Sequence, residues 1–162
     1  WNNLDLVDKF QKCVDLAREG KEAGWTNNLH LSGITKYIWF LRPNGWTMCD
    51  RFARRGLCIC EDGPGAFVRF YQELQGRGFE ATAGHISATI QQNIHGFTEL
   101  YGERVIDKYL MIAGGAVESG LIRQAQDSLD GLNAEDAANA EAVAQAVANQ
   151  HCNDPFFLPP QT

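Results

Sequence analysis

Apolar residues recur at three- and four-residue steps through most of the chain, which is the spacing of one face of an α-helix. The first such stripe runs from Leu4 to Ala17 and stops at Gly20. Later stripes keep the same period and are separated by glycine, proline or Asn-Gly turns. No segment shows the alternation with a period of two that is typical of a strand. The pattern therefore predicts an all-α fold of seven or eight helices.

The remaining helices are placed by the breaks between stripes. They are expected over about 33–41, 48–55, 67–74, 83–101, 103–113, 117–129 and 134–149. Ser32, Thr47 and Asn133 are the expected caps, because a side-chain oxygen there can accept a hydrogen bond from a free N–H group. We expect one helical domain over residues 1–150 and an extended, proline-rich arm over 151–162. The expected core residues are Ile34, Ile38, Leu41, Phe52, Phe67, Phe70, Ile90, Phe97, Ile106 and Leu110.

Charge is distributed unevenly along the chain. There are 14 Lys and Arg residues against 20 Asp and Glu, and the net charge of −6 by itself disfavours binding to a nucleic acid. No Lys or Arg follows Arg123, so the C-terminal part is acidic. Residues 31–58, in contrast, carry Asp50 as their one acidic residue among five basic ones: Lys36, Arg42, Arg51, Arg54 and Arg55. The sequence predicts a locally positive face on an acidic protein.

Length and composition add two expectations. A chain of 162 residues is the size of one domain. No apolar run approaches the roughly 18–20 residues that span a bilayer, so no membrane partner is expected. The chain has five cysteines, an odd number that suits a reducing compartment better than a disulfide framework, and we expect a cytoplasmic protein.

The most informative segment is Leu31–Leu57, which reads LSGITKYIWFLRPNGWTMCDRFARRGL. Its first residues have the composition of a hairpin that enters a helix, and Asp50 opens a second, arginine-rich helix. A lysine and an aspartate at neighbouring helix starts, in the most basic part of the chain, favour a nucleic-acid site. Ordinary helix-end chemistry is the alternative, since Thr47-x-x-Asp50 is itself a capping box and Lys36 is a solvated lysine in that interpretation.

This segment resembles the core of the helix-hairpin-helix DNA glycosylase superfamily. There, a Leu-Pro-Gly-Ile/Val-Gly hairpin leads into a helix with a catalytic lysine, and a catalytic aspartate begins another helix. Leu31-Ser32-Gly33-Ile34-Thr35-Lys36 corresponds to the hairpin and lysine, with Thr35 in place of the second glycine, and Trp46–Leu57 corresponds to the aspartate segment. Residues 104–110, RVIDKYL, resemble a stretch that recurs in uncharacterised proteins related to the superfamily.

The resemblance implies a glycosylase-like fold and excision of a damaged or modified base from DNA. Asp50 would stabilise the cation-like sugar, and Lys36 would be a candidate Schiff-base nucleophile. The backbone N–H groups of Gly33 and Thr35 would hold a phosphate. The expected contacts to the DNA backbone and bases come from Arg51, Arg54, Arg55 and a stacking tryptophan, Trp46 or Trp39.

Cysteine offers a different chemistry. Cys49, Cys58 and Cys60, with a histidine such as His85 or His95, could form a zinc site. The Cys-x-Cys spacing is not that of a zinc knuckle, and cysteine is commonly a buried apolar residue. We therefore expect no metal, and no motif in the chain indicates a cofactor.

A second class of function is a helical interaction module without catalysis. In that interpretation the acidic, alanine-rich C-terminal helix and the PFFLPP tail bind a partner protein or a second copy of the chain. The adjacent Phe156 and Phe157 are the apolar residues that such an interaction would use.

Overall fold

The computed structural model describes residues 1–93, 101–115 and 133–151. These residues contain no strand, and their all-α class is as expected from the sequence. The expected helix over 117–129, Phe97 and the expected arm from residue 152 onward lie outside the described residues. The described helices are α1 (Leu6–Glu22), α2 (Leu31–Leu41), α3 (Arg51–Gly56), α4 (Pro64–Gly76), α5 (Phe79–Asn93), α6 (Gly102–Ala113) and α8 (Ala134–His151).

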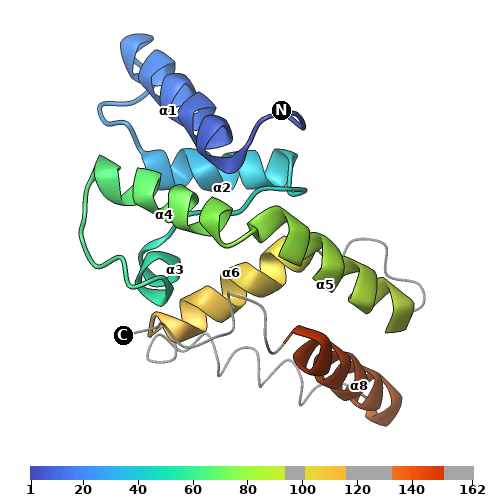
Figure 1. Ribbon diagram of the computed structural model, residues 1–162. Helices are drawn as coiled ribbons and strands as arrows, with labels where there is room; N and C mark the ends of the chain where they lie inside the picture. The colour runs from blue at the N-terminus through green and yellow to red at the C-terminus, as the bar shows by residue number, and fades with distance from the viewer. Residues whose placement is uncertain (94–100, 116–132, 152–162) are drawn as a thin grey trace.

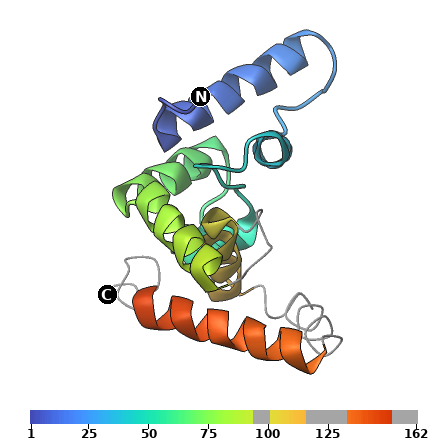
Figure 2. The same ribbon diagram turned by 90° about the vertical axis from the view of Figure 1, so that its right-hand side faces the viewer.

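The helices are arranged so that α1 and α2 lie at one end and α8 at the other (Figures 1 and 2). Between them, α4 and α5 follow one another with only a short turn, and α6 packs against both α3 and α5. The short helix α3 is held mainly by α6. No described helix is long and apolar enough to cross a membrane.

A stack of aromatic rings forms the part of the core that fixes the connection between α2 and α3. The ring of Trp46 stacks on Tyr71 of α4 with centroids 4.6 Å apart, and Tyr71 stacks on Phe10 of α1 at 4.8 Å. Trp46 and Tyr71 are fully buried. Tyr71 also donates its hydroxyl hydrogen to the carbonyl of Thr47 at 2.9 Å. Such stacked pairs stabilise beyond the area they bury, so the connection is anchored from inside the protein.

Helices α3 and α6 approach so closely that glycine is required between them. A Cβ atom added at Gly56 would lie 2.2 Å from the carbonyl oxygen of Leu110. A Cβ atom at Gly114 would lie 1.9 Å from the carbonyl oxygen of Phe52. Both contacts are with main-chain atoms, which cannot rotate away as a side chain can. The position of α3 on α6 therefore depends on the absence of side chains at Gly56 and Gly114.

The expected core is confirmed in part. Phe70, Ile90, Ile106 and Leu110 are buried. Ile34, Ile38, Phe52 and Phe67 are partly buried. The expectation for Leu41 is wrong, because its side chain is 59% exposed. Helix α2 is apolar on most of its circumference, so its periodicity alone does not determine which side faces the core.

The start of α2 differs from the expectation. The helix begins at Leu31, so the residues that were expected to form a hairpin are its first turn. His30 occupies the cap position with a φ of 41° and makes no side-chain capping hydrogen bond. Ser32 is not the cap, because its hydroxyl donates to the carbonyl of Cys49 at 3.1 Å. This contact with another segment was not readable from the local sequence.

The start of α3 also differs, whereas α8 begins as expected. Thr47 does not cap α3, because residues 46–49 lie along α2 and α4 without helical structure. Asp50 is the cap itself, and the helix begins one residue later, at Arg51. Asn133 does cap α8, since its side-chain oxygen accepts a hydrogen bond from the backbone N–H of Glu135 at 3.1 Å.

Candidate functional site

The site begins with the hydrogen bonds that hold residues 46–49 along α2. The hydroxyl of Thr35 accepts a hydrogen bond from the backbone N–H of Cys49 at 3.3 Å. The carbonyl of Thr35 accepts one from Nε1 of Trp46 at 3.1 Å. With the bond from Ser32 to the Cys49 carbonyl, these contacts fix the 46–49 segment to the first half of α2. Lys36 follows Thr35 and Asp50 follows Cys49, so the two expected catalytic residues flank the same junction.

Asp50 stands at the N-terminus of α3 and is partly buried. Its Oδ1 accepts a hydrogen bond from the backbone N–H of Ala53 at 2.8 Å. The cap uses one carboxylate oxygen, and a carboxylate has further acceptor sites on the other. Asp50 can therefore hold α3 in place and still present an oxygen to another group.

A second carboxylate, that of Asp107, belongs to α6, the helix that packs against α3. It is buried and forms an ion pair with Arg104, one turn earlier on the same helix. Burial raises the pKa of Asp107 from 3.8 to about 6, the negative charge of Asp50 raises it further, and Arg104 opposes both effects. A carboxyl group with a pKa in this range can exchange a proton near neutral pH, and such groups are common in catalytic sites.

The thiol of Cys49 lies among these charges. It is buried, and burial raises its pKa. Among the charged groups that act on this pKa, Arg54 has the largest effect and lowers it, Asp50 and Asp107 raise it, and Lys36 has the smallest effect and lowers it. We refer to Lys36, Asp50, Arg104 and Asp107 as the Asp50 cluster. It combines residues from α2, α6 and the start of α3.

Two of the residues that were expected to contact DNA are built into the protein interior. Trp46 is fully buried, so its expected stacking on a base is not met. The guanidinium of Arg54 is buried; it donates to the carbonyl of Glu61 at 2.6 Å and to Asp62 at 3.1 Å, and it lies over the ring of Phe67. Arg54 therefore holds the loop between α3 and α4 and is not presented to a DNA backbone.

The other expected DNA contacts reach the surface or its edge. Lys36, Arg51 and Arg55 are exposed, and Arg51 lies 4.9 Å from the ring centre of Phe52. The backbone N–H of Thr35 falls within the regular hydrogen bonding of α2 and is not free to hold a phosphate.

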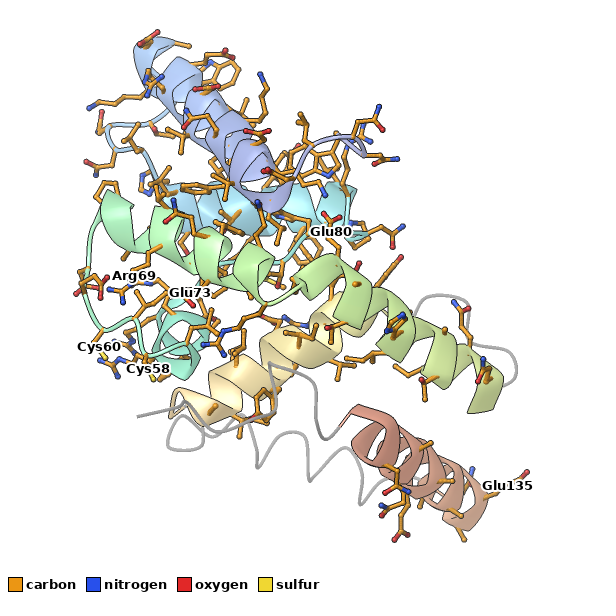
Figure 3. The ribbon with its side chains drawn as sticks, viewed as in Figure 1. Cys58, Cys60, Arg69, Glu73, Glu80 and Glu135 are labelled. Atoms are coloured by element: carbon orange, nitrogen blue, oxygen red, sulfur yellow. The ribbon has the colours of Figure 1, made fainter. Side chains whose placement is uncertain are left out.

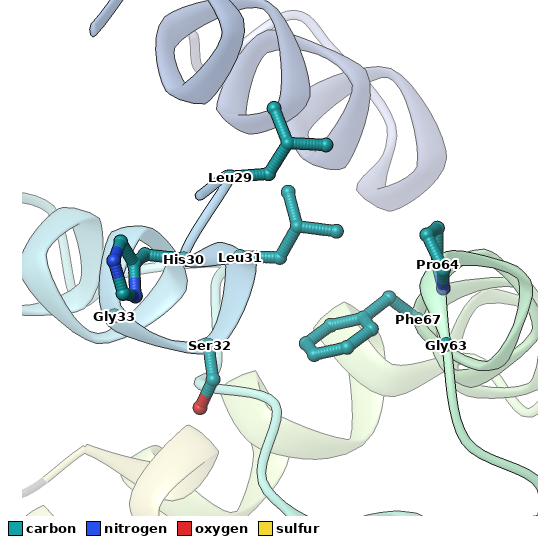
Figure 4. A pocket seen from close by; sticks show the side chains of 8 residues that line it. All are labelled: Leu29, His30, Leu31, Ser32, Gly33, Gly63, Pro64 and Phe67. Atoms are coloured by element: carbon teal, nitrogen blue, oxygen red, sulfur yellow. The ribbon is translucent and has the colours of Figure 1, made fainter. Parts of the chain in front are cut away.

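Gly33 lines an open pocket beside the starts of α2 and α4 (Figure 4). The pocket has a volume of about 340 Å³, and most of its lining side chains are apolar, with Leu29, Leu31 and Phe67 among them. Lys36 and Asp50 do not line it. This pocket is therefore separate from the Asp50 cluster.

The cysteines are divided between interior and surface. Cys49 is buried, whereas Cys58 and Cys60 are exposed on the loop between α3 and α4 (Figure 3). Within the described ranges, no three His, Cys, Asp or Glu side chains gather closely enough to hold a metal ion.

Two substitutions of Asp50 test its structural role as the cap of α3, separately from any chemical role. Asp50→Ala should lower the free energy of unfolding by about 1 kcal/mol, because the Ala53 N–H loses its acceptor. Asp50→Asn should change it by only a few tenths of a kcal/mol, since asparagine is an equally good cap. Urea unfolding of both variants at pH 7 provides the measurement. An equal decrease in the free energy of unfolding in the two variants would show that the negative charge of Asp50, and not its capping hydrogen bond, stabilises α3.

Asp107 should make stability depend on pH in an unusual direction. Its pKa is about 6 in the folded chain against an ordinary 3.8, so the folded state binds the proton more tightly than the unfolded state. This contribution is fully present below pH 4 and is lost as the pH rises through 6. The free energy of unfolding of the native chain, minus that of Asp107→Asn, should fall by roughly 2 kcal/mol between pH 4 and pH 7. A difference that is flat with pH would contradict the raised pKa.

Sequence reasoning did not include Asp107 and Arg104 among the site residues. The RVIDKYL stretch was the one sequence feature that pointed to these two residues, but nothing local to it indicates that α6 packs against α3.

Comparisons with protein-family models, with curated protein sequences and with solved structures found no match to this chain.

Proposed function

We propose that the chain is a DNA glycosylase-like protein that removes a damaged or modified base from DNA. The observation that supports this most is the Asp50 cluster: the hydrogen bond between Thr35 and Cys49 sets Lys36 and Asp50 beside one junction, and Asp107 is buried on α6, the helix that packs against α3. Exposed Arg51 and Arg55 lie on α3, directly after Asp50, where they would meet phosphates.

In this proposal Asp50 acts on the sugar of an extruded nucleotide. The bond between C1′ and the base nitrogen breaks, the base leaves with the electron pair, and the sugar becomes cation-like. The carboxylate of Asp50 stabilises that cation or takes a proton from the attacking water. Asp107 is the second carboxyl group; because its side chain is buried and paired with Arg104, its assigned role is to hold that guanidinium and not to touch the base.

Lys36 provides a second route to the same products. Its amine would attack C1′, displace the base and form a Schiff base with the opened sugar, which water then hydrolyses. The side chain of Lys36 is exposed to solvent, so bound DNA has to remove water from it before the amine can act. The Asp50 route needs no such change and is the one we favour.

The test of this function is a panel of duplexes that carry damaged or modified bases. Base release is measured by chromatography, and a covalent adduct is sought by borohydride trapping. Lys36→Ala is compared with Lys12→Ala, an exposed lysine on α1 that serves as a control for the loss of one surface charge. An adduct that is lost only in Lys36→Ala would establish the lysine route, and base release without an adduct would establish the Asp50 route.

The rival function is supported by the exposure of α8. Most of its described side chains face solvent, and they include the carboxylates Glu135 and Glu141 (Figure 3 labels Glu135). A chain that releases no base from any duplex and binds no DNA at low salt would contradict the glycosylase proposal. The acidic α8 would then be the surface to examine for a protein partner.

A further inference from the structure

Helix α2 has an apolar side that nothing in the described protein covers. Tyr37, Phe40 and Leu41 are 58%, 74% and 59% exposed. They are spaced three and four residues apart, so they lie together on one side of the helix. The opposite side carries Leu31 and Thr35, which are buried. We call Lys36, Tyr37, Phe40 and Leu41 the α2 face.

The α2 face is basic as well as aromatic. Lys36 lies four residues before Phe40 and is exposed, and Arg42, just after the helix, is exposed too. Helix α2 contains no Asp or Glu, although the chain as a whole has a net charge of −6. A patch with cations and no carboxylate, on an acidic protein, is complementary to a polyanion.

The ring of Phe40 is held in place from behind. Trp39 contacts it edge to face, with centroids 5.3 Å apart. Trp39 also contacts the ring of Tyr101, and the guanidinium of Arg104 lies 5.5 Å from its ring centre. Arg104 is the partner of Asp107, so this chain of contacts joins the α2 face to the Asp50 cluster.

We infer that the α2 face binds the unpaired bases of a DNA strand, with Tyr37 and Phe40 stacking on bases and Lys36 and Arg42 contacting phosphates. Aromatic rings beside cations are the usual surface for single-stranded nucleic acids. The inference rests on the proposed function, because extruding a nucleotide at the Asp50 cluster leaves the base opposite it unpaired and free to stack on an exposed ring. It assigns to exposed residues the stacking role that buried Trp46 cannot fill.

The test is binding of a fluorescein-labelled oligothymidylate to the full chain, measured by anisotropy at low salt. The double variant Tyr37→Ala/Phe40→Ala should weaken binding at least about tenfold. Trp25→Ala removes another exposed aromatic ring, 78% exposed and distant in sequence, and should leave affinity within about twofold. Lys36→Gln should reduce the slope of log Kd against log salt by about 0.7, the value for one phosphate contact on a single strand. Circular dichroism confirms that each variant is folded.

The possible outcomes separate this inference from the proposed function. Strand binding that depends on Tyr37 and Phe40, in a chain that releases no base, would support the inference and contradict the function. Base release that survives Tyr37→Ala/Phe40→Ala, with unchanged strand affinity, would overturn the inference alone. The inference is also overturned if the double variant instead abolishes a dimer in sedimentation or binding to anionic phospholipid vesicles.

Discussion

Asp50→Asn is expected to lower the rate of base release by about 100-fold or more. The substitution removes the negative charge that stabilises the sugar cation, and acid–base groups of this kind contribute about 10²–10⁴-fold to a rate. It keeps an acceptor for the Ala53 N–H, so α3 should remain capped. The rate is measured under single-turnover conditions on the duplex that the native chain cleaves best.

The matched control for this change is Asp62→Asn. Asp62 is an exposed aspartate on the loop after α3, so its substitution removes the same charge from the same region. It should leave the rate within about twofold, because Asp62 contacts Arg54 and not the Asp50 cluster. A rate that falls equally in both variants would show that the effect is one of general charge, and Asp50 would lose its assigned role.

Gly56→Ala is expected to destabilise the fold by about 3 kcal/mol or more. Its new Cβ would lie 2.2 Å from the carbonyl oxygen of Leu110, and the clash is relieved only if α3 moves away from α6. Overpacking of this kind costs about 1–3 kcal/mol and occasionally more, and a main-chain contact has no rotamer that avoids it. The same movement would separate Asp50 from Asp107, so any base release should fall with stability.

Gly76→Ala is the matched control, since Gly76 is the last residue of α4 as Gly56 is of α3. A Cβ atom at Gly76 meets nothing within 4 Å. Alanine should therefore be neutral there, or stabilising by up to about 1 kcal/mol through the loss of backbone freedom in the unfolded chain. Thermal unfolding of both variants gives the comparison. Equal stability of the two would contradict the close packing of α3 on α6.

The helices that could be predicted from the sequence are those with one clearly apolar side and one clearly polar side. In α4, Phe67, Phe70 and Leu74 follow the helical period between Gly-Pro-Gly and a closing glycine, and the structure places the helix there. In α6, Ile106 and Leu110 mark the buried side correctly. The spacing of apolar residues is enough to predict these helices, because the residues on the predicted apolar side are the ones that are buried.

The candidate site could be predicted only in part, because its details depend on contacts between distant segments. Thr47 looked like a cap, but hydrogen bonds from the 46–49 segment to α2 and α4 prevent a helix from starting there. Arg54 was expected to contact a DNA backbone, but the loop after α3 folds back and binds it. The apolar run of α2 concealed that Tyr37 and Phe40 face solvent. Lys36 and Asp50 flank one junction, and their joint action on a single sugar stays a prediction.

The most direct test of the account is a crystal structure of Asp50→Asn bound to a duplex that carries a tetrahydrofuran sugar in place of one nucleotide. This analogue has no base to lose, and the variant keeps the cap on α3. We expect the analogue's sugar to lie between the side chains of Lys36 and Asn at position 50, with the unpaired base opposite the analogue stacked on Tyr37 or Phe40. A sugar bound elsewhere on the protein, or a duplex that does not bind at low salt, would contradict it.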